Sequence, residues 1–311
     1  MAKKFYYGGQ AVIEGVMMRG QKGIAVAVRR PNGEIALNSE PLGRLSTSRI
    51  REIPLVRGIV VLVETLVLGI RTLFYSASVS VDEEVNISPW MLWGSVAVGF
   101  ILALALFMGL PLLATHYVDP YISPAVSNLV DGVIRLVIFV IYLGAISLMP
   151  DIRRVFAYHG AEHKTINAYE AGEPLEVEKV RKYSTAHSRC GTNFLLIVMV
   201  IAIIAFVFLG REALWLRYLE RILLMPVIAA ISYEVIKFGA AHIKNIVVRI
   251  VLTPGLALQA MTTRQPDDRQ IEVAISALQR VLALDAESTL KLAEETTSVT
   301  GMADGPGGVH L

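Results

Sequence analysis

The side chains best suited to chemistry lie in one polar segment, residues 149–192. His159 and His163 are four residues apart, so on a helix their imidazole rings project from the same face and can share one metal ion. Glu162 completes the pattern H-x-x-E-H, the inverse of the H-E-x-x-H arrangement in which the glutamate acts as a general base. The spacing therefore predicts a metal site at which Glu162 is the candidate catalytic residue.

Three further residues of the same segment are candidate metal ligands. Glu170 follows His163 by seven residues and falls close to the same helical face. His187 and Cys190 are three residues apart, and imidazole with thiolate is a ligand set that suits zinc. Cys190 is also the only cysteine, which excludes an internal disulfide. The expected cofactor is a divalent metal, zinc first, held by the two histidines of the pair with one or more of these three residues.

A non-metal interpretation explains the same pattern. Histidine pairs at this spacing occur on many helices, and a segment that closes the end of a helix bundle can use His and Glu for hydrogen bonds. Outside the segment, Glu14 and Arg19 are candidates because glycines flank them, although the spacing favours a structural role in a small sheet with tight turns. Glu234 and His242 are candidates for a further ligand or a proton relay, provided that they face the histidine cluster.

The composition indicates a membrane protein. Of 311 residues, 54% are hydrophobic and 18% are charged, whereas soluble domains have about 45–50% and about 25%. A helix needs about 20 mostly apolar residues to cross the hydrocarbon layer. Four segments approach that length, and the third of them is short: 90–115, 126–148, 194–210 and 222–241. The predicted fold class is an α-helical integral membrane protein with about four transmembrane helices and a small N-terminal β-rich region.

A fifth apolar segment, 53–76, has a different pattern. Arg57, Glu64 and Arg71 recur at intervals of seven and so share one helical face. The pattern favours an amphipathic helix that lies at the membrane surface or packs under the bundle over a transmembrane span.

The distribution of Lys and Arg sets the orientation. The connection 116–128 contains neither residue, so it is predicted to lie outside, and the polar segments around the other spans are rich in both. The connection 211–221 is the exception, because Arg211, Arg217 and Arg221 fall on the predicted outer side. The prediction is a multi-pass protein of the cell (inner) membrane with both termini cytoplasmic.

The predicted organisation has seven parts. Pro31-Asn32-Gly33 between two apolar-rich runs indicates a β-hairpin in the N-terminal part. The parts are a cytoplasmic β-rich region (1–52), the interfacial or re-entrant helix (53–76), a first transmembrane hairpin (90–148), the polar segment (149–192), a second hairpin (193–241), cytoplasmic helices (242–284) and a disordered tail (285–311).

Several long motifs resemble one known family. The motifs are GGQAVIEGVMMRG at 8–20, YHGAEHKTINAYE at 158–170, HSRCGT at 187–192 and QPDD at 265–268. They resemble the YqhQ-like family of bacterial membrane proteins, which carry a domain of unknown function, and the resemblance covers about residues 5–283. It implies a protein described as a metal-dependent enzyme by prediction, with five residues at family-motif positions: His159, Glu162, His163, His187 and Cys190. The resemblance implies no substrate.

Three functions fit these observations. The first is a zinc-type hydrolase at the cytoplasmic membrane face, with Glu162 as the base and a lipid-linked or membrane-protein substrate. The second is a non-catalytic membrane factor in which the same segment forms a structural metal site or polar clasp. The third is a small transporter that uses Asp131, Arg135 and Glu234 along a path. A net charge of +2 gives no case for nucleic-acid binding, so the expected partner is the lipid bilayer.

Overall fold

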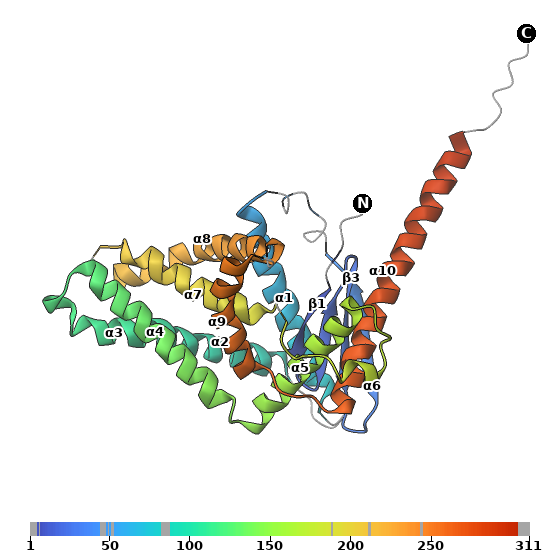
Figure 1. The fold of residues 1–311 in the computed structure, drawn as a ribbon, viewed down its shortest axis with the longest axis horizontal. Coiled ribbons are helices and arrows are strands. Elements are labelled where there is room, and N and C mark those ends of the chain that lie inside the picture. The colour runs from blue at the N-terminus through green and yellow to red at the C-terminus, as the bar shows by residue number, and fades with distance from the viewer. Residues whose placement is uncertain are drawn as a thin grey trace, which may run out of the picture.

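The computed structural model describes residues 5, 7–43, 48, 50, 53–81, 88–187, 189–210, 213–242 and 245–303. These residues form a small antiparallel sheet, helices that cover its two faces, and a set of apolar helices that extends away from the sheet (Figure 1). The structure is mostly helical, as the composition predicts.

The N-terminal region is a four-stranded sheet in sequential order. Its strands are β1 (Gly8–Val12), β2 (Gly15–Arg19), β3 (Gly23–Arg29) and β4 (Ile35–Pro41), and every neighbouring pair is antiparallel. The predicted hairpin joins β3 to β4, where Gly33 has a φ of 92° that an L side chain rarely adopts. The β-rich prediction for this part of the chain is therefore confirmed for the described residues.

Both faces of the sheet are buried, which explains its apolar runs. One face packs against α5 (Pro150–Glu170) and α10 (Asp268–Ala303) through Val16, Met18, Ala25 and Ala27. Side chains of a strand alternate between faces, so the intervening residues lie on the other face. That face packs against Leu68, Tyr75 and Val79 of α1 (Val56–Val79). Its buried residues are Val12, Met17, Ile24, Val26 and Val28. The sheet is thus the central layer between one helix on one side and two on the other.

Four helical stretches are long and apolar enough to cross a membrane. They are α1, the stretch Trp90–His116, α4 (Pro124–Ile146) and Leu214–Gly239 within α8 (Leu214–Ala241). Trp90–His116 combines α2 (Pro89–Leu104), a π-helical turn (Ala105–Gly109) and α3 (Leu110–His116). The predicted span 194–210 corresponds to α7 (Gly191–Val207), which has only 17 residues, and α9 (Ile246–Thr262) is a second shorter apolar helix.

The apolar helices do not all run in one direction. In Figure 1, α7 and α8 run side by side along the long dimension of the molecule, and α4 packs on α7. In contrast, α1 and α9 run across them at the end nearest the sheet. Arg57 of α1 forms an ion pair with Glu234 of α8, whereas Thr72 and Ser76 of α1 bond to Gln10 and to the backbone N–H of Ile13. Helix α1 therefore joins the bundle to the sheet.

The charges of the bundle are buried and paired. Asp131 pairs with Arg135 at 2.8 Å, as their spacing predicts, and with Arg221 at 2.9 Å. Arg217 pairs with Asp119 at 2.7 Å. The predicted bounds of the connection, 211–221, are therefore corrected, because α8 begins at Leu214 and Arg217 and Arg221 are buried within it beside carboxylates. Residues 211 and 212 lie outside the described residues.

Helix α10 is longer than the predicted C-terminal helix. It runs to Ala303, where the sequence indicates a disordered tail from residue 285, and residues 304–311 lie outside the described residues. Asp285 is buried and accepts hydrogen bonds from the backbone N–H groups of Gln21 and Lys22 and from the Tyr7 hydroxyl. The start of the tail at 285 is therefore corrected, since this carboxylate attaches α10 to the turn between β2 and β3.

Candidate metal centre

Helix α5 carries the histidine pair. Pro150 occupies the first helical turn, where its missing N–H costs nothing, and Asp151 lies at the positive end of the helix. The helix packs beside α10 on one face of the sheet, and its His159 and His163 side chains contact the backbone of Thr262 and Thr185. His163 is only 1% exposed, and the two ring centroids are 4.3 Å apart.

Cys190 meets this pair from the start of α7. It is the N-cap residue of that helix, and its Sγ atom accepts from the Thr192 N–H at 3.4 Å. Its Sγ atom is 3.3 Å from Nε2 of His159. One ligand atom from each of His159, His163 and Cys190 lies within 4.8 Å of the other two. The predicted meeting of the two imidazoles with a third ligand-type group is therefore found in the structure.

The second nitrogen of each ring is held by a backbone carbonyl. Nδ1 of His159 is 2.9 Å from the Thr262 oxygen, and Nδ1 of His163 is 2.6 Å from the Thr185 oxygen. Because a carbonyl only accepts, each Nδ1 must carry the proton and donate it. In the neutral rings the Nε2 atoms are then the acceptors, which is the arrangement that metal-binding histidines usually have.

His187 lies next to the cluster but outside it. Its ring centroid is 5.5 Å from that of His163, and its Nδ1 lies 2.9 Å from the Asn167 side-chain oxygen. The Gln259 amide bonds to both the N–H and the carbonyl of His187, each at 2.9 Å. These contacts fix the loop that delivers Cys190 to the histidine pair.

Glu162 is buried beside the pair. Its Oε2 is 3.5 Å from Nε2 of His163, and it accepts a hydrogen bond from the Gly9 N–H. A Cβ atom at Gly9 would lie 3.2 Å from Cγ of Glu162 and would collide with the Met17 carbonyl oxygen, so only glycine fits here. A cavity of about 90 Å³ opens between these groups, and its wall includes Tyr7, the three histidines and the cysteine.

The buried groups shift one another's protonation. Burial alone would raise the pKa of Cys190, but hydrogen bonds and positive charge from His159 and His163 lower it to about 4. Burial would lower the pKa of His159, but its hydrogen bond to Cys190 and the negative charges nearby raise it to about 9. Burial and the charge of Arg189 lower the pKa of His187 to about 3, and burial raises that of Glu162. The arrangement thus favours a thiolate opposite an imidazolium in the metal-free protein.

Glu170, a predicted ligand, lies away from the cluster. It forms an ion pair with Arg189 and is not among the residues whose ligand atoms converge. Helical spacing predicts a position near the histidine face, but the guanidinium group holds the carboxylate. The structure therefore does not bring Glu170 into the ligand set.

The other candidates also have partners elsewhere. Glu14 lies in the β1–β2 turn with a φ of 52° and pairs with Arg154. Arg19 pairs with Glu64 at 2.9 Å. Glu234 pairs with Arg57, and Nδ1 of the exposed His242 bonds to the Phe238 oxygen at 2.9 Å. Glu234 and His242 therefore do not face the histidine cluster.

Sequence reasoning misses several supporting groups. Asn167 lies four residues after His163, so the helical period could have placed it on the same face. Gln259 and the carbonyls of Thr185 and Thr262 come from other segments, and their residue types carry no local signal. Gly9 is visible in the sequence only as part of a glycine-flanked strand.

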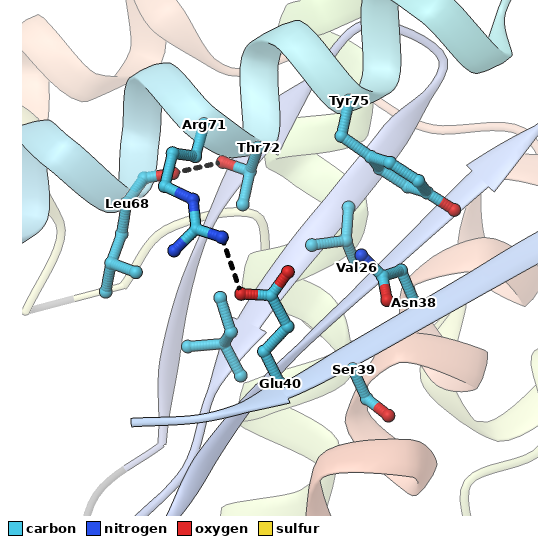
Figure 2. Close-up of a pocket in the computed structure, with 9 residues that line it drawn as sticks. Val26, Asn38, Ser39, Glu40, Leu68, Arg71, Thr72 and Tyr75 are labelled. Carbon is cyan, nitrogen blue, oxygen red and sulfur yellow. Dashed lines mark hydrogen bonds and ion pairs between the residues drawn. The ribbon is translucent and has the colours of Figure 1, made fainter. Parts of the chain in front are cut away.

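A separate cavity lies between α1 and the strands β3 and β4. It has a volume of about 170 Å³, and Figure 2 shows Arg71 and Tyr75 of α1 facing Glu40 and Asn38 of β4 across it. The Arg71–Glu40 ion pair, at 2.9 Å, spans one side. Its described lining contains none of the predicted site residues, so this cavity is not part of the candidate centre.

Comparisons with known proteins agree with the resemblance drawn from the motifs. The model of the family described as "Protein of unknown function (DUF1385)" matches residues 53–284. A relative from Bacillus subtilis (strain 168), named "Uncharacterized protein YqhQ", is 34% identical over 299 residues, which cover 91% of this chain and 94% of the relative. No solved structure matches the chain.

Proposed function

We propose that this chain, which belongs to the DUF1385 family of YqhQ-like proteins, is an integral membrane metalloenzyme of the hydrolase type. In this proposal His159, His163 and Cys190 bind one divalent metal ion, zinc first, and Glu162 is the catalytic base. One observation carries the proposal. Backbone carbonyls accept hydrogen bonds from the Nδ1 atoms of both histidines, and this directs both Nε2 atoms toward one thiolate.

The donor set fits zinc. Two imidazoles and a thiolate are borderline-to-soft ligands, and three protein ligands with one open position are typical of catalytic zinc. Tetrahedral bonding at ordinary Zn–N and Zn–S lengths separates ligand atoms by about 3.3–3.7 Å. The 3.3 Å between Nε2 of His159 and Sγ of Cys190 already matches, and small rotations bring the third atom into range.

The protein groups around the ion suit a hydrolysis. A bound zinc ion lowers the pKa of a water molecule toward neutrality. With an ion bound, Glu162, 3.5 Å from Nε2 of His163, would be placed to accept a proton at its carboxylate and to return that proton to the leaving group of the substrate. One water molecule is consumed, one substrate bond breaks, and the carboxylate ends in its starting state.

The packing of the sheet supports an even number of membrane crossings between the sheet and α5, and between α5 and α10. The sheet, α5 and α10 share one hydrophobic core, so all three must lie on the same side of a membrane. Crossing by Trp90–His116 and back by α4 returns the chain to that side, as does crossing by α7 and α8. If α1 or α9 also crossed, the core would be divided. We therefore assign α1 and α9 to the membrane surface.

The charge distribution supports a cytoplasmic location for this core. The connection 116–128 has no Lys or Arg, whereas the segments that form the core contain many. Arg217 and Arg221 are buried against Asp119 and Asp131, so they no longer count as outer loop charges. The N-terminal sheet and α10 are then both cytoplasmic, and the protein belongs to the cell (inner) membrane.

A structural metal site is the second candidate, because His187 lies close by. With its ring centroid 5.5 Å from that of His163, a modest loop movement would make it a fourth protein ligand and close the site. A transport function has less support. The residues that would line a path are held in ion pairs, Asp131 with Arg135 and Glu234 with Arg57.

The proposal is tested by metal analysis of the detergent-purified protein, together with X-ray absorption at the zinc edge. We expect one zinc ion per chain with two nitrogen ligands, one sulfur ligand and one light oxygen ligand. Protein purified after growth with added zinc that holds no stoichiometric metal would contradict metal binding. Coordination by three nitrogens and one sulfur would indicate the closed, structural site instead.

A further inference from the structure

A larger cavity adjoins the candidate metal centre. It has a volume of about 430 Å³ and lies between α1 and the strands β1 and β2. Its wall shares Gly8, Gly9 and Arg189 with the small cavity that the histidines and Cys190 line. A Cβ atom at Gly8 would meet no atom within 4 Å, so this strand leaves open space where the two cavities meet. A molecule in the larger cavity would therefore reach the metal centre across the β1 backbone.

Part of the wall of this cavity is apolar. Its apolar wall is formed by Phe5, Met17, Leu42, Val61 and Leu68. Val61 and Leu68 belong to α1, so this helix covers the cavity. The opposite face of α1 exposes a second set of apolar side chains, of which Leu66 is 56% exposed: Ile59, Val63, Leu66, Val67 and Leu73. A helix at the membrane surface would bury that set in lipid and hold the cavity at the lipid boundary.

The wall of the cavity also carries two guanidinium groups. Arg19 is paired with Glu64 and Arg189 with Glu170, and both arginines also line the cavity. A guanidinium group has five N–H donors in a planar fork, so a carboxylate partner fixes its orientation without using every donor. Such a pair favours an acceptor-rich, anionic group, for which phosphate is the best geometric match.

We propose that this cavity binds an anionic phospholipid, with an acyl chain against the apolar wall under α1 and the phosphate near Arg19 and Arg189. The lipid would be the substrate of the metal centre, and only this catalytic step, not the binding itself, rests on the proposed function. A phosphate beside Arg189 lies at the wall that both cavities share, next to Cys190 in the chain. The lipid would enter from the membrane along α1.

The cavity in Figure 2 does not have these properties. It lies on the other side of Leu68, holds about 170 Å³, and is bounded by the Arg71–Glu40 ion pair. Its described lining shares no residue with the candidate metal centre. Among these three cavities of the described residues, the cavity that Arg19 and Arg189 line has both an apolar wall and cationic groups, and it adjoins the candidate metal centre.

The test uses a matched pair of valine substitutions in α1. Val61→Trp fills the cavity, whereas Val67→Trp places the same side chain on the exposed apolar face, where Val67 is 53% exposed. Binding of phosphatidylglycerol to the full-length, detergent-purified protein is measured by native mass spectrometry and by lipid titration. Phosphatidylcholine and inorganic phosphate are measured in parallel. We expect Val61→Trp to weaken phosphatidylglycerol binding at least tenfold and Val67→Trp to leave it unchanged.

Two further variants keep the outcome clear. Gly8→Leu extends a side chain into the open space of the cavity and is also expected to weaken lipid binding. This variant tests the cavity if Val61→Trp does not fold. The double variant His159→Ala/His163→Ala is expected to lose metal and keep lipid. Equal lipid binding by Val61→Trp and Val67→Trp would overturn the inference. Equal affinity of the protein for inorganic phosphate and for phosphatidylglycerol would also overturn it, as would loss of lipid binding in the variant that loses the metal. A protein that binds lipid but no zinc would refute the proposed function alone.

Discussion

The Nε2 atom of His159 lies 3.3 Å from the Sγ atom of Cys190, a residue 31 positions further along the chain. The contact joins the inward face of α5 to the N-cap of α7. Since the Thr262 carbonyl holds the other ring nitrogen, the imidazole of His159 is oriented toward the thiolate by a third segment. This contact therefore requires α7 to be assembled together with the core that the sheet, α5 and α10 share.

Loss of any one ligand should release the metal. We expect His159→Ala, His163→Ala and Cys190→Ser each to lower zinc affinity more than the 10–100-fold typical of changes to residues that only support a ligand, because each removes a direct ligand atom. His242→Ala is the matched histidine control, since His242 is exposed and bonds only locally. Zinc content per purified chain and competition with a chelator measure the effect.

Glu162→Gln separates the base from the ligands. The substitution keeps the shape of the side chain and lies outside the three-residue ligand cluster, so full zinc content is expected. Zinc loss as large as that of the His163 variant would show instead that Glu162 is a ligand.

Zinc affinity should rise with pH through the neutral range. In the metal-free protein His159 has a pKa of about 9 and is protonated below it, whereas Cys190 has a pKa of about 4 and is already a thiolate above it. Binding near pH 7 must therefore displace roughly one proton, from His159. The affinity should increase about tenfold per pH unit until pH approaches the pKa of His159 and then level off.

Calorimetry in buffers of different ionisation enthalpy measures that proton directly. In Cys190→Ser, His159 loses the neighbour that raises its pKa, so less proton release is expected for whatever metal still binds. Below neutrality a zinc-bound water keeps its protons, so proton release of two or more by the wild-type protein in that range would contradict the thiolate assignment, because the cysteine would then be losing a proton as well.

Close contact at Gly160 should make that position intolerant of a side chain. A Cβ atom there would collide with the Arg264 carbonyl oxygen, close to the Thr262 carbonyl that orients His159. We expect Gly160→Ala to destabilise the protein by about 1–3 kcal/mol, the cost typical of overpacking, and to weaken zinc binding. Gly191→Ala is the control, since its Cβ would meet no atom within 4 Å. Thermal unfolding followed by tryptophan fluorescence measures the stability of both variants.

The candidate centre was partly predictable because its first element is local. The spacing of His159 and His163 determines a shared helical face whatever the rest of the chain does. The choice of third ligand depends on tertiary contacts that spacing does not encode. Arg189 binds Glu170, and Gln259 of a distant helix fixes the backbone of His187, which leaves Cys190 nearest the pair.

Hydropathy likewise predicted the apolar stretches but not their roles. By length and composition α1 qualifies as a span, whereas α7, with 17 residues, does not. The decision depends on the contact of the sheet with α5 and α10, which are far apart in sequence, and no local pattern reveals it. The seven-residue recurrence of Arg57, Glu64 and Arg71 was informative because each of these residues forms an ion pair with another element.

The position of α1 gives a last prediction. Its two ends should be accessible from the same side of the membrane, because its first turns contact α8 near Glu234 and its last turns contact the sheet. In a Cys190→Ser background, which removes the only native thiol, single cysteines replace Pro54 before α1 and Ser80 after it. An impermeant maleimide added to inside-out vesicles should label both, and neither in right-side-out cells. A cysteine at Tyr121, in the connection between α3 and α4, is the opposite-side control, because Tyr121 is 84% exposed.

Labelling of the Pro54 and Ser80 positions from different sides would make α1 a true span. The sheet and α5 could then not share one core across an odd number of crossings, so at least one of the other apolar stretches before α5 would have to remain outside the bilayer.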